Sequence, residues 1–324
     1  MAEIGVAEQA LQFVPARPSL RARALTRVVR LVVKHWPRND MAAVVRRSRR
    51  VFGLGAPLSF LHTAGLKVEQ VQEGSVRGEW LAPAQLEHNA SVLLYLHGGG
   101  YVSCSPQSHR AITASLARLL KGRVFALDYR LAPESPFPAA VDDAAAVYRW
   151  FLNNGIEPEN IAVAGDSAGG GLTLALLLRL RRMGLPLPAC AVCLSPWVDL
   201  TGKYDYRNRQ TCAMFTGNEV GAFAALYLQS APAESEEASP LFADLRGLPP
   251  LLIQASSTEL LLDDALRLQE RAVQCGMEPH LSIYPGLPHV WPMFVGLIPE
   301  AGLALREIAK FVREAQRQSQ LQGA

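Results

Sequence analysis

Short runs of consecutive apolar residues alternate along the chain with longer segments in which apolar residues recur every three to four positions. The first pattern is typical of strands buried on both faces, and the second of helices that cover a sheet. Core strands are expected at 91–96, 124–127, 161–164, 189–194, 251–254 and 280–284. Helices are expected at 108–120, 139–153, 168–183, 263–275 and 299–316. Strands that alternate with helices predict an α/β fold with a mostly parallel sheet.

Two parts of the chain depart from this alternation. Residues 66–72 and 75–81 alternate between apolar and polar positions, which predicts two antiparallel strands with one wet face and an eight-stranded sheet. Residues 200–238 form an insertion with a helical pattern and several aromatic residues, whereas residues 1–60 are helical and basic. We therefore expect a core in two parts, 61–199 and 239–324, under a helical cap that residues 1–60 and 200–238 form.

Positive charge is concentrated near the N-terminus. Residues 17–50 hold eleven Lys and Arg against one acid, Asp40, so this segment carries +10 and leaves −7 for the rest of a chain whose net charge is +3. That small net charge does not indicate a protein that binds nucleic acid. A basic helix can dock on a membrane. Apolar residues at helical spacing favour a face packed on the body instead; they are Leu25, Val28, Val29, Val32 and Trp36. Membrane contact is therefore not expected.

Cysteine usage does not indicate a disulfide framework, because the number is odd and the chain is long. The Cys-x-x-Cys at 190–193 lies inside an apolar run, and no second pair or histidine cluster supplies zinc ligands. We expect small core side chains at all five positions, which are Cys104, Cys190, Cys193, Cys212 and Cys275. No secretory leader or membrane-spanning stretch is evident, so a cytoplasmic location is expected by default.

The strongest chemical signal is a Gly-x-Ser-x-Gly pentapeptide, Gly165-Asp166-Ser167-Ala168-Gly169. A predicted strand precedes it and a predicted helix follows it, which is the context that a nucleophilic serine on a sharp turn requires. Glycines on both sides leave room for the strained backbone. The pattern predicts Ser167 as a nucleophile, although so short a motif also occurs by chance.

A glycine-rich loop, His97-Gly98-Gly99-Gly100, directly follows the strand at 91–96. Glycines let backbone N–H groups approach a ligand, and acyl transfer needs such donors where an oxyanion forms. Loops of this type serve lipases and esterases, together with the N–H of the residue after the serine, here Ala168. A phosphate-binding loop is the alternative, but no dinucleotide or Walker pattern accompanies these glycines.

A base and an acid should follow the serine in chain order. His289 lies on a turn-rich loop after the last strand, whereas His109 begins a helix and His280 falls in a strand. Three carboxylates follow the strand at 251–254, and of these Glu259 is nearest to the strand end. Asp263 and Asp264 start the next helix, where N-capping explains them adequately.

Taken together, these motifs resemble those of the hormone-sensitive-lipase-like family of α/β-hydrolases, the bacterial family IV esterases. The stretch Asp128-Tyr129-Arg130-Leu131-Ala132-Pro133-Glu134 adds to the likeness, which runs from about residue 60 to the C-terminal helix. Many relatives carry Asp-Pro at the position of the acid, whereas this chain has Glu259-Leu260. The resemblance implies that Glu259 is the acid and that the N–H groups of Gly99, Gly100 and Ala168 bind the oxyanion. It also implies scaffold roles for Arg130 and Glu134.

The resemblance implies a serine carboxylesterase for short- to medium-chain acyl esters, with no metal or organic cofactor. An amidase or deacetylase, a long-chain lipase and an inactive binding protein remain as alternatives. The expected partner is a small ester, and homodimers occur in the family. Large apolar side chains that could line the substrate pocket are Tyr101, Trp197, Met214, Phe215, Phe223 and Trp291.

Overall fold

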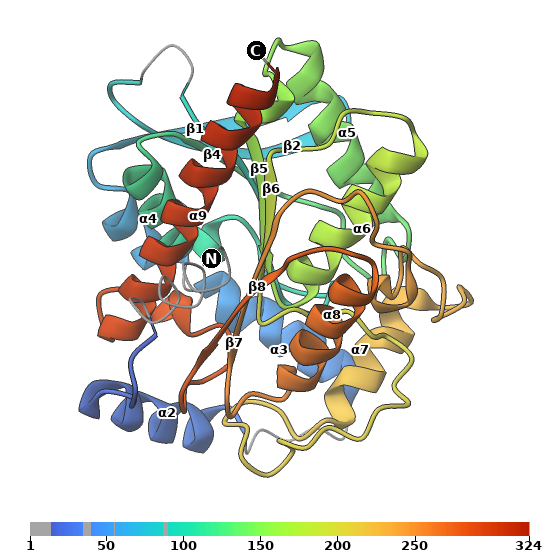
Figure 1. Ribbon diagram of the computed structural model, residues 1–324. Coiled ribbons are helices and arrows are strands. Elements are labelled where there is room, and N and C mark those ends of the chain that lie inside the picture. Colours follow the sequence, from blue (N-terminus) through green and yellow to red (C-terminus); the bar gives the residue numbers. More distant parts are fainter. Residues whose placement is uncertain (1–13, 35–39, 55, 87–89, 324) are drawn as a thin grey trace.

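The computed structural model describes residues 14–34, 40–54, 56–86 and 90–323, and an eight-stranded sheet runs through its centre (Figure 1). The strand order is β1-β2-β4-β3-β5-β6-β7-β8. The first two pairings are antiparallel and the others parallel, as expected from alternating patterns in β1 and β2 and continuous apolar runs in the rest. The strands are β1 Leu66–Glu73, β2 Val76–Pro83, β3 Val92–Leu96, β4 Arg123–Leu127, β5 Ile161–Asp166, β6 Cys190–Leu194, β7 Leu251–Ser256 and β8 His280–Tyr284.

Helices cover both faces of this sheet. The core helices are α4 Arg110–Leu120, α5 Ala139–Asn153, α6 Ala168–Arg182, α8 Leu262–Gln274 and α9 Pro299–Gly323. One apolar cluster packs α4 and α9 against alternate strand residues such as Leu93 and Tyr95. The intervening residues Leu94 and Leu96 pack with α5 and α6 on the opposite face. The predicted α/β-hydrolase architecture is thereby confirmed.

The remaining helices lie at the carboxyl ends of the parallel strands. They are α2 Leu20–Val32, α3 Met41–Leu54 and α7 Asn218–Leu228, and a 3-10 helix at Ala56–Thr63 leads into β1. Figure 1 shows α3 close to α7, while α2 lies at the lower edge of the molecule. None of the helices in the described ranges combines the length and hydropathy that crossing a bilayer requires.

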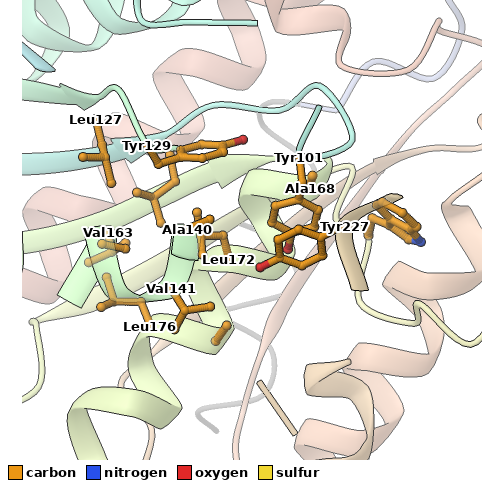
Figure 2. Packing of buried hydrophobic residues seen from close by; sticks show 14 of the residues in the cluster. Tyr101, Leu127, Tyr129, Ala140, Val141, Val163, Ala168, Leu172, Leu176 and Tyr227 are labelled. Carbon is orange, nitrogen blue, oxygen red and sulfur yellow. The ribbon is translucent and has the colours of Figure 1, made fainter. Parts of the chain in front are cut away.

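The cap helix α7 is fastened to the core through stacked aromatic rings. Tyr101, which follows the glycine loop, lies parallel to Tyr227 of α7 with ring centroids 3.7 Å apart. Figure 2 shows this pair beside Ala168 at the start of α6. Both tyrosines are buried, and Tyr101 is not among the residues that line the cavity described below, where a place in the substrate pocket was expected. Its ring is a packing element between α6 and α7.

Two basic side chains tie the N-terminal helices to the rest. Lys34, just beyond α2, donates to three carbonyl oxygens of the 200–238 insertion, those of Arg209, Gln210 and Cys212. Arg49 of α3 donates to the carbonyl oxygens of Val102 and Ala132, each at 2.7 Å, and forms an ion pair with Glu134. Because Val102 and Ala132 flank the site described below, α3 is bound directly to the loops that build it.

The outward side of α2 departs from expectation. Val29 is buried and Leu25 is half-buried, but Val28 and Val32 are exposed, so burial of the whole predicted apolar face is wrong. Trp36, the last residue of that pattern, lies outside the described residues. Periodicity identified the helix, but the helix has apolar residues on two sides, and only one of them packs against the body.

Candidate active site

Ser167 is the single residue between β5 and α6. It lies on a turn, in a backbone conformation that L-residues rarely adopt. Its φ is 53° and its ψ −119°. The chain passes so close to β3 that a Cβ added to Gly169 would lie 1.9 Å from the carbonyl oxygen of Leu96. Side chains are therefore excluded beside the serine, as the motif predicts. A strained turn held by close packing raises Ser167 above the end of the sheet, where its side chain borders a cavity.

Asp166, the residue before the serine, anchors the glycine loop. Its Oδ1 accepts the N–H of Gly98 at 3.1 Å and the hydroxyl of Tyr95 at 2.8 Å. Its Oδ2 lies 3.3 Å from Nε2 of His109. Burial alone would raise the pKa of Asp166, but the charge and hydrogen bonds of His109 and Tyr95 outweigh burial and lower it. An ionised carboxylate thus fixes the position of the glycine loop relative to Ser167.

His97, which begins the same loop, is a scaffold residue. Its Nδ1 lies 2.7 Å from the carbonyl oxygen of Gly98, so Nδ1 carries the proton and donates. Its ring stacks on Tyr129, with centroids 4.2 Å apart, and the Tyr129 hydroxyl donates to the carbonyl oxygen of His97. Burial, reinforced by the nearby His109, lowers the pKa of His97 to about 3. The imidazole is therefore neutral and contributes no acid or base near neutral pH.

Three backbone donors meet at this loop. Within the described ranges, the N–H groups of Gly99, Gly100 and Ala168 donate to no acceptor of the protein. Ala168 is the first residue of α6, so its N–H points out of the helix start with the positive end of the helix dipole. Gly99, Gly100 and Ser167 border the same cavity. This arrangement can stabilise negative charge that develops next to the serine hydroxyl.

His289 and Glu259 form a short buried pair. Nδ1 of His289 lies 2.5 Å from Oε2 of Glu259, and the other carboxylate oxygen accepts the N–H of Ser256 at 2.6 Å. A carboxylate only accepts hydrogen bonds, so Nδ1 carries the proton and Nε2 presents a lone pair. Among the described atoms, Nε2 has no hydrogen-bond partner, Ser167 included. His289 borders the cavity together with Ser167.

Two serines at the end of β7 join the loop of the acid to the loop of the histidine. The Ser256 hydroxyl accepts the N–H of Leu287 at 2.9 Å and donates to its carbonyl oxygen at 2.8 Å. The Ser257 hydroxyl accepts the N–H of Gly286 at 3.0 Å. Sequence reasoning did not assign these residues a role. The adjacency of β7 and β8 could have suggested one, because parallel neighbours place their carboxyl ends together.

The other two acids have different partners, and the N-capping expectation for them is wrong. Asp263 and Asp264 lie inside the first turn of α8, whose N-cap residue is Leu261. Asp264 accepts the N–H groups of Val198 and Asp199, at 2.9 and 3.1 Å. Asp263 binds the backbone N–H and the guanidinium of Arg207. Both acids hold the segment that leads from β6 into the cap, and Glu259 alone reaches His289.

A cavity of about 380 Å³ lies above Ser167 and His289. Its remaining walls are mostly apolar and come from the 200–238 insertion, from α3, from the residue that caps the end of α2 and from the segment after His289. Of the predicted pocket residues, Trp197, Met214, Phe215 and Phe223 line it. Further lining residues that sequence reasoning missed are Val33, Cys104, Val220, Leu261, Met293 and Phe294. Trp291 belongs instead to a buried cluster with Tyr284 and Ala22, so its predicted pocket role is wrong.

Two cap phenylalanines contact the reactive parts directly. The Phe215 ring meets the His289 ring edge to face, with centroids 5.4 Å apart. Phe223 of α7 lies over the glycine loop, where a Cβ on Gly100 would be 3.1 Å from Cγ of the phenylalanine. The cap therefore closes the cavity over both the base and the backbone donors. Cys104, expected in the core, borders this cavity too, and burial raises the pKa of its thiol to about 12.

Other predicted residues contribute to the scaffold. Arg130 pairs with the buried Asp143 of α5, and Glu134 pairs with Arg49 of α3. In the part of the chain that the structure describes, no three His, Cys, Asp or Glu side chains gather as metal ligands would. The groups that border the cavity and could take part in chemistry are Ser167, His289 with Glu259, and the backbone donors.

Comparisons with known proteins identify the family of the chain. A family model described as the alpha/beta hydrolase fold matches residues 93–293. An acetyl-hydrolase of Streptomyces hygroscopicus is 41% identical over 273 residues, which cover 83% of this chain and 87% of that protein. A crystal structure of an esterase from the bacterial hormone-sensitive lipase family superposes with a TM-score of 0.82, at 38% identity, over 92% of this chain and 99% of that one.

The chain belongs to the hormone-sensitive-lipase-like family of α/β-hydrolases. An esterase of Acinetobacter venetianus is 36% identical over 76% of this chain and 82% of its own. A crystal structure of EstE5 soaked with p-nitrophenyl butyrate has a TM-score of 0.85 at 37% identity, over 92% of this chain and 99% of that chain. Like these relatives, this family member is a carboxylic ester hydrolase.

Proposed function

We propose that the enzyme is a serine carboxylesterase that hydrolyses short- to medium-chain acyl esters through an acyl-enzyme on Ser167. One observation carries the proposal. His289 is held by Glu259 through Nδ1, while its Nε2 has no partner among the described atoms and borders the cavity that Ser167 enters. A base oriented in this way has a free lone pair for the serine proton.

The proposed cycle has two halves. In the first, His289 takes the hydroxyl proton as Ser167 Oγ attacks the ester carbonyl, and the N–H groups of Gly99, Gly100 and Ala168 bind the oxyanion. The imidazolium, stabilised by Glu259, then protonates the leaving alcohol. In the second half, His289 activates a water that attacks the acyl-enzyme, and the acid departs as Ser167 regains its proton.

The size and chemistry of the cavity support the substrate class. Its volume of about 380 Å³ lies near the small end of the roughly 300–1,000 Å³ range of small-molecule sites. On the cap side, Phe215 contacts the His289 ring and Phe223 lies over the glycine loop, so large apolar side chains form much of this wall. The relatives support short acyl groups as well, since one is an acetyl-hydrolase and EstE5 was soaked with a butyrate ester.

The test is hydrolysis of p-nitrophenyl esters from acetate to palmitate by the wild type and by Ser167→Ala. We expect the highest kcat/KM on short chains and a loss of roughly 10⁶-fold in kcat for the variant, because the nucleophile cannot be replaced. Ser115→Ala on α4 is the matched control, since its hydroxyl binds only the carbonyl of Ala111. A preference for palmitate would contradict the substrate class. Turnover retained by Ser167→Ala would contradict the mechanism.

A further inference from the structure

The outward side of α2 carries an apolar stripe that the described part of the protein leaves exposed. Leu20, Ala24, Val28 and Leu31 follow one another at helical spacing, so they share one side of the helix. Leu20 is 75%, Val28 55% and Leu31 70% exposed. The opposite side of α2, with Ala22 and Val29, is the side that packs on the body.

Arginines flank this stripe on both sides. Arg21 lies on one flank and Arg23 and Arg27 on the other, as the turn of 100° per residue dictates, and all three are exposed. Residues 14–34 contain no Asp or Glu that could neutralise them. Arg30 and Lys34, at the C-terminal end of this segment, bind carbonyl oxygens of the 200–238 insertion instead. The exposed side of α2 is therefore both apolar and strongly cationic.

The inner side and the C-terminal end of α2 border the catalytic cavity. Val33, which caps the C-terminal end of α2, lines the cavity. Phe294 lines the cavity as well and packs in the same cluster as Ala22 and Leu25, on the inner side of the helix. The C-terminal end of α2 therefore lies next to the cavity wall.

We propose that the exposed side of α2 docks the enzyme on an anionic lipid surface. An apolar stripe flanked by arginines is the pattern with which amphipathic helices lie in the headgroup region, where the apolar residues enter the acyl boundary and the cations face anionic headgroups. A second copy of this chain fits less well. Pairing two such sides would place Arg21, Arg23 and Arg27 of both copies together, with no acid on either helix to separate the charges.

The experiment is co-sedimentation of the full-length protein with vesicles of phosphatidylcholine, with and without phosphatidylglycerol. Binding is expected only to the anionic vesicles and should weaken as salt is added. Arg21→Gln/Arg23→Gln/Arg27→Gln should lower the partition constant about fivefold for each arginine. Leu20→Ser/Leu31→Ser should lower it by about tenfold or more, because two leucines leave the acyl boundary.

Matched controls remove the same charge or the same apolar groups elsewhere. Lys121→Gln/Arg149→Gln/Arg317→Gln changes exposed cations on other helices and turns, and Val273→Ser/Leu321→Ser changes exposed apolar residues of α8 and α9. Both controls should bind as the wild type does. Equal losses in the controls, absence of vesicle binding by the wild type, or a dimer in analytical ultracentrifugation that Leu20→Ser/Leu31→Ser dissociates would overturn the proposal. Sedimentation needs no turnover, so the result is independent of the proposed esterase mechanism.

Discussion

The two walls of the active-site cavity are held in different ways. On the core side, each functional group is fixed by buried hydrogen bonds at the ends of strands: Asp166 holds the glycine loop, and Glu259 holds His289. On the cap side, Phe215 and Phe223 meet the site through ring and backbone contacts alone. From this difference we expect the core to determine the chemistry and the cap to determine which esters reach it.

Removing the charge of the acid tests whether Glu259 holds and stabilises His289 on the core side. Glu259→Gln keeps the size of the side chain, but an amide no longer favours the proton on Nδ1 of His289 and no longer stabilises the imidazolium. We expect kcat on p-nitrophenyl butyrate to fall by about 10³- to 10⁴-fold, with little change in thermal unfolding. Asp263→Asn is the rival-acid control, and its kcat should stay within about tenfold of the wild type. A larger loss in that control would reassign the acid.

A smaller effect is expected on the opposite side of the serine. Asp166→Asn exchanges one acceptor oxygen for a donor and removes the charge that holds Gly98 and faces His109. The glycine loop should shift by a fraction of an ångström, and kcat should fall by about tenfold to a hundredfold while KM changes little. Affinity for a boronic acid, which forms a tetrahedral adduct, should fall in parallel with kcat.

Tyr95→Phe is the graded companion of that variant. It removes one of the two hydrogen bonds to Oδ1 and leaves the carboxylate in place. Its affinity for the boronic acid should lie between that of the wild type and that of Asp166→Asn. If both variants changed KM and left boronic-acid affinity intact, Asp166 would serve only folding, and the claim that the core positions the backbone donors would fail.

The core could be predicted from the sequence because its determinants are local. Continuous apolar runs indicated the strands. The glycines of the serine motif indicated the turn, and at Gly169 the backbone of β3 is indeed too close for a side chain. The errors have non-local causes. Tyr101 is buried because its stacking partner Tyr227 comes from the insertion, and no local pattern pairs these two rings. The α2 stripe was misjudged because periodicity shows that a helix has apolar residues but not which side the body covers.

Phe223→Ala tests whether the cap determines the preferred acyl-chain length. Truncation removes a ring that covers the glycine loop and enlarges the cavity without touching Ser167, His289 or Glu259. The ratio of kcat/KM for octanoate to that for butyrate should rise by about tenfold, while kcat on acetate stays within a few-fold. Phe242→Ala changes an exposed phenylalanine away from the cavity and should leave the ratio unchanged. Equal losses on all chain lengths would mean that the cap also positions the reacting atoms.

The smallest expected effect concerns the junction between the two walls. Burial raises the pKa of Asp264 to about 7, so the folded state keeps its proton at a pH where the unfolded chain has lost it. Stability from this group is full below the unfolded pKa, about 3.9, is lost as pH rises from there through the folded pKa of about 7, and levels off above it. Asp264→Asn lacks this decline. Its free energy of unfolding relative to the wild type should therefore rise by about 2 kcal/mol between about pH 5 and pH 8. Urea unfolding at both pH values measures the change. A difference that falls with pH would mean that the N–H groups of Val198 and Asp199 keep Asp264 ionised and that charge holds the cap to the core.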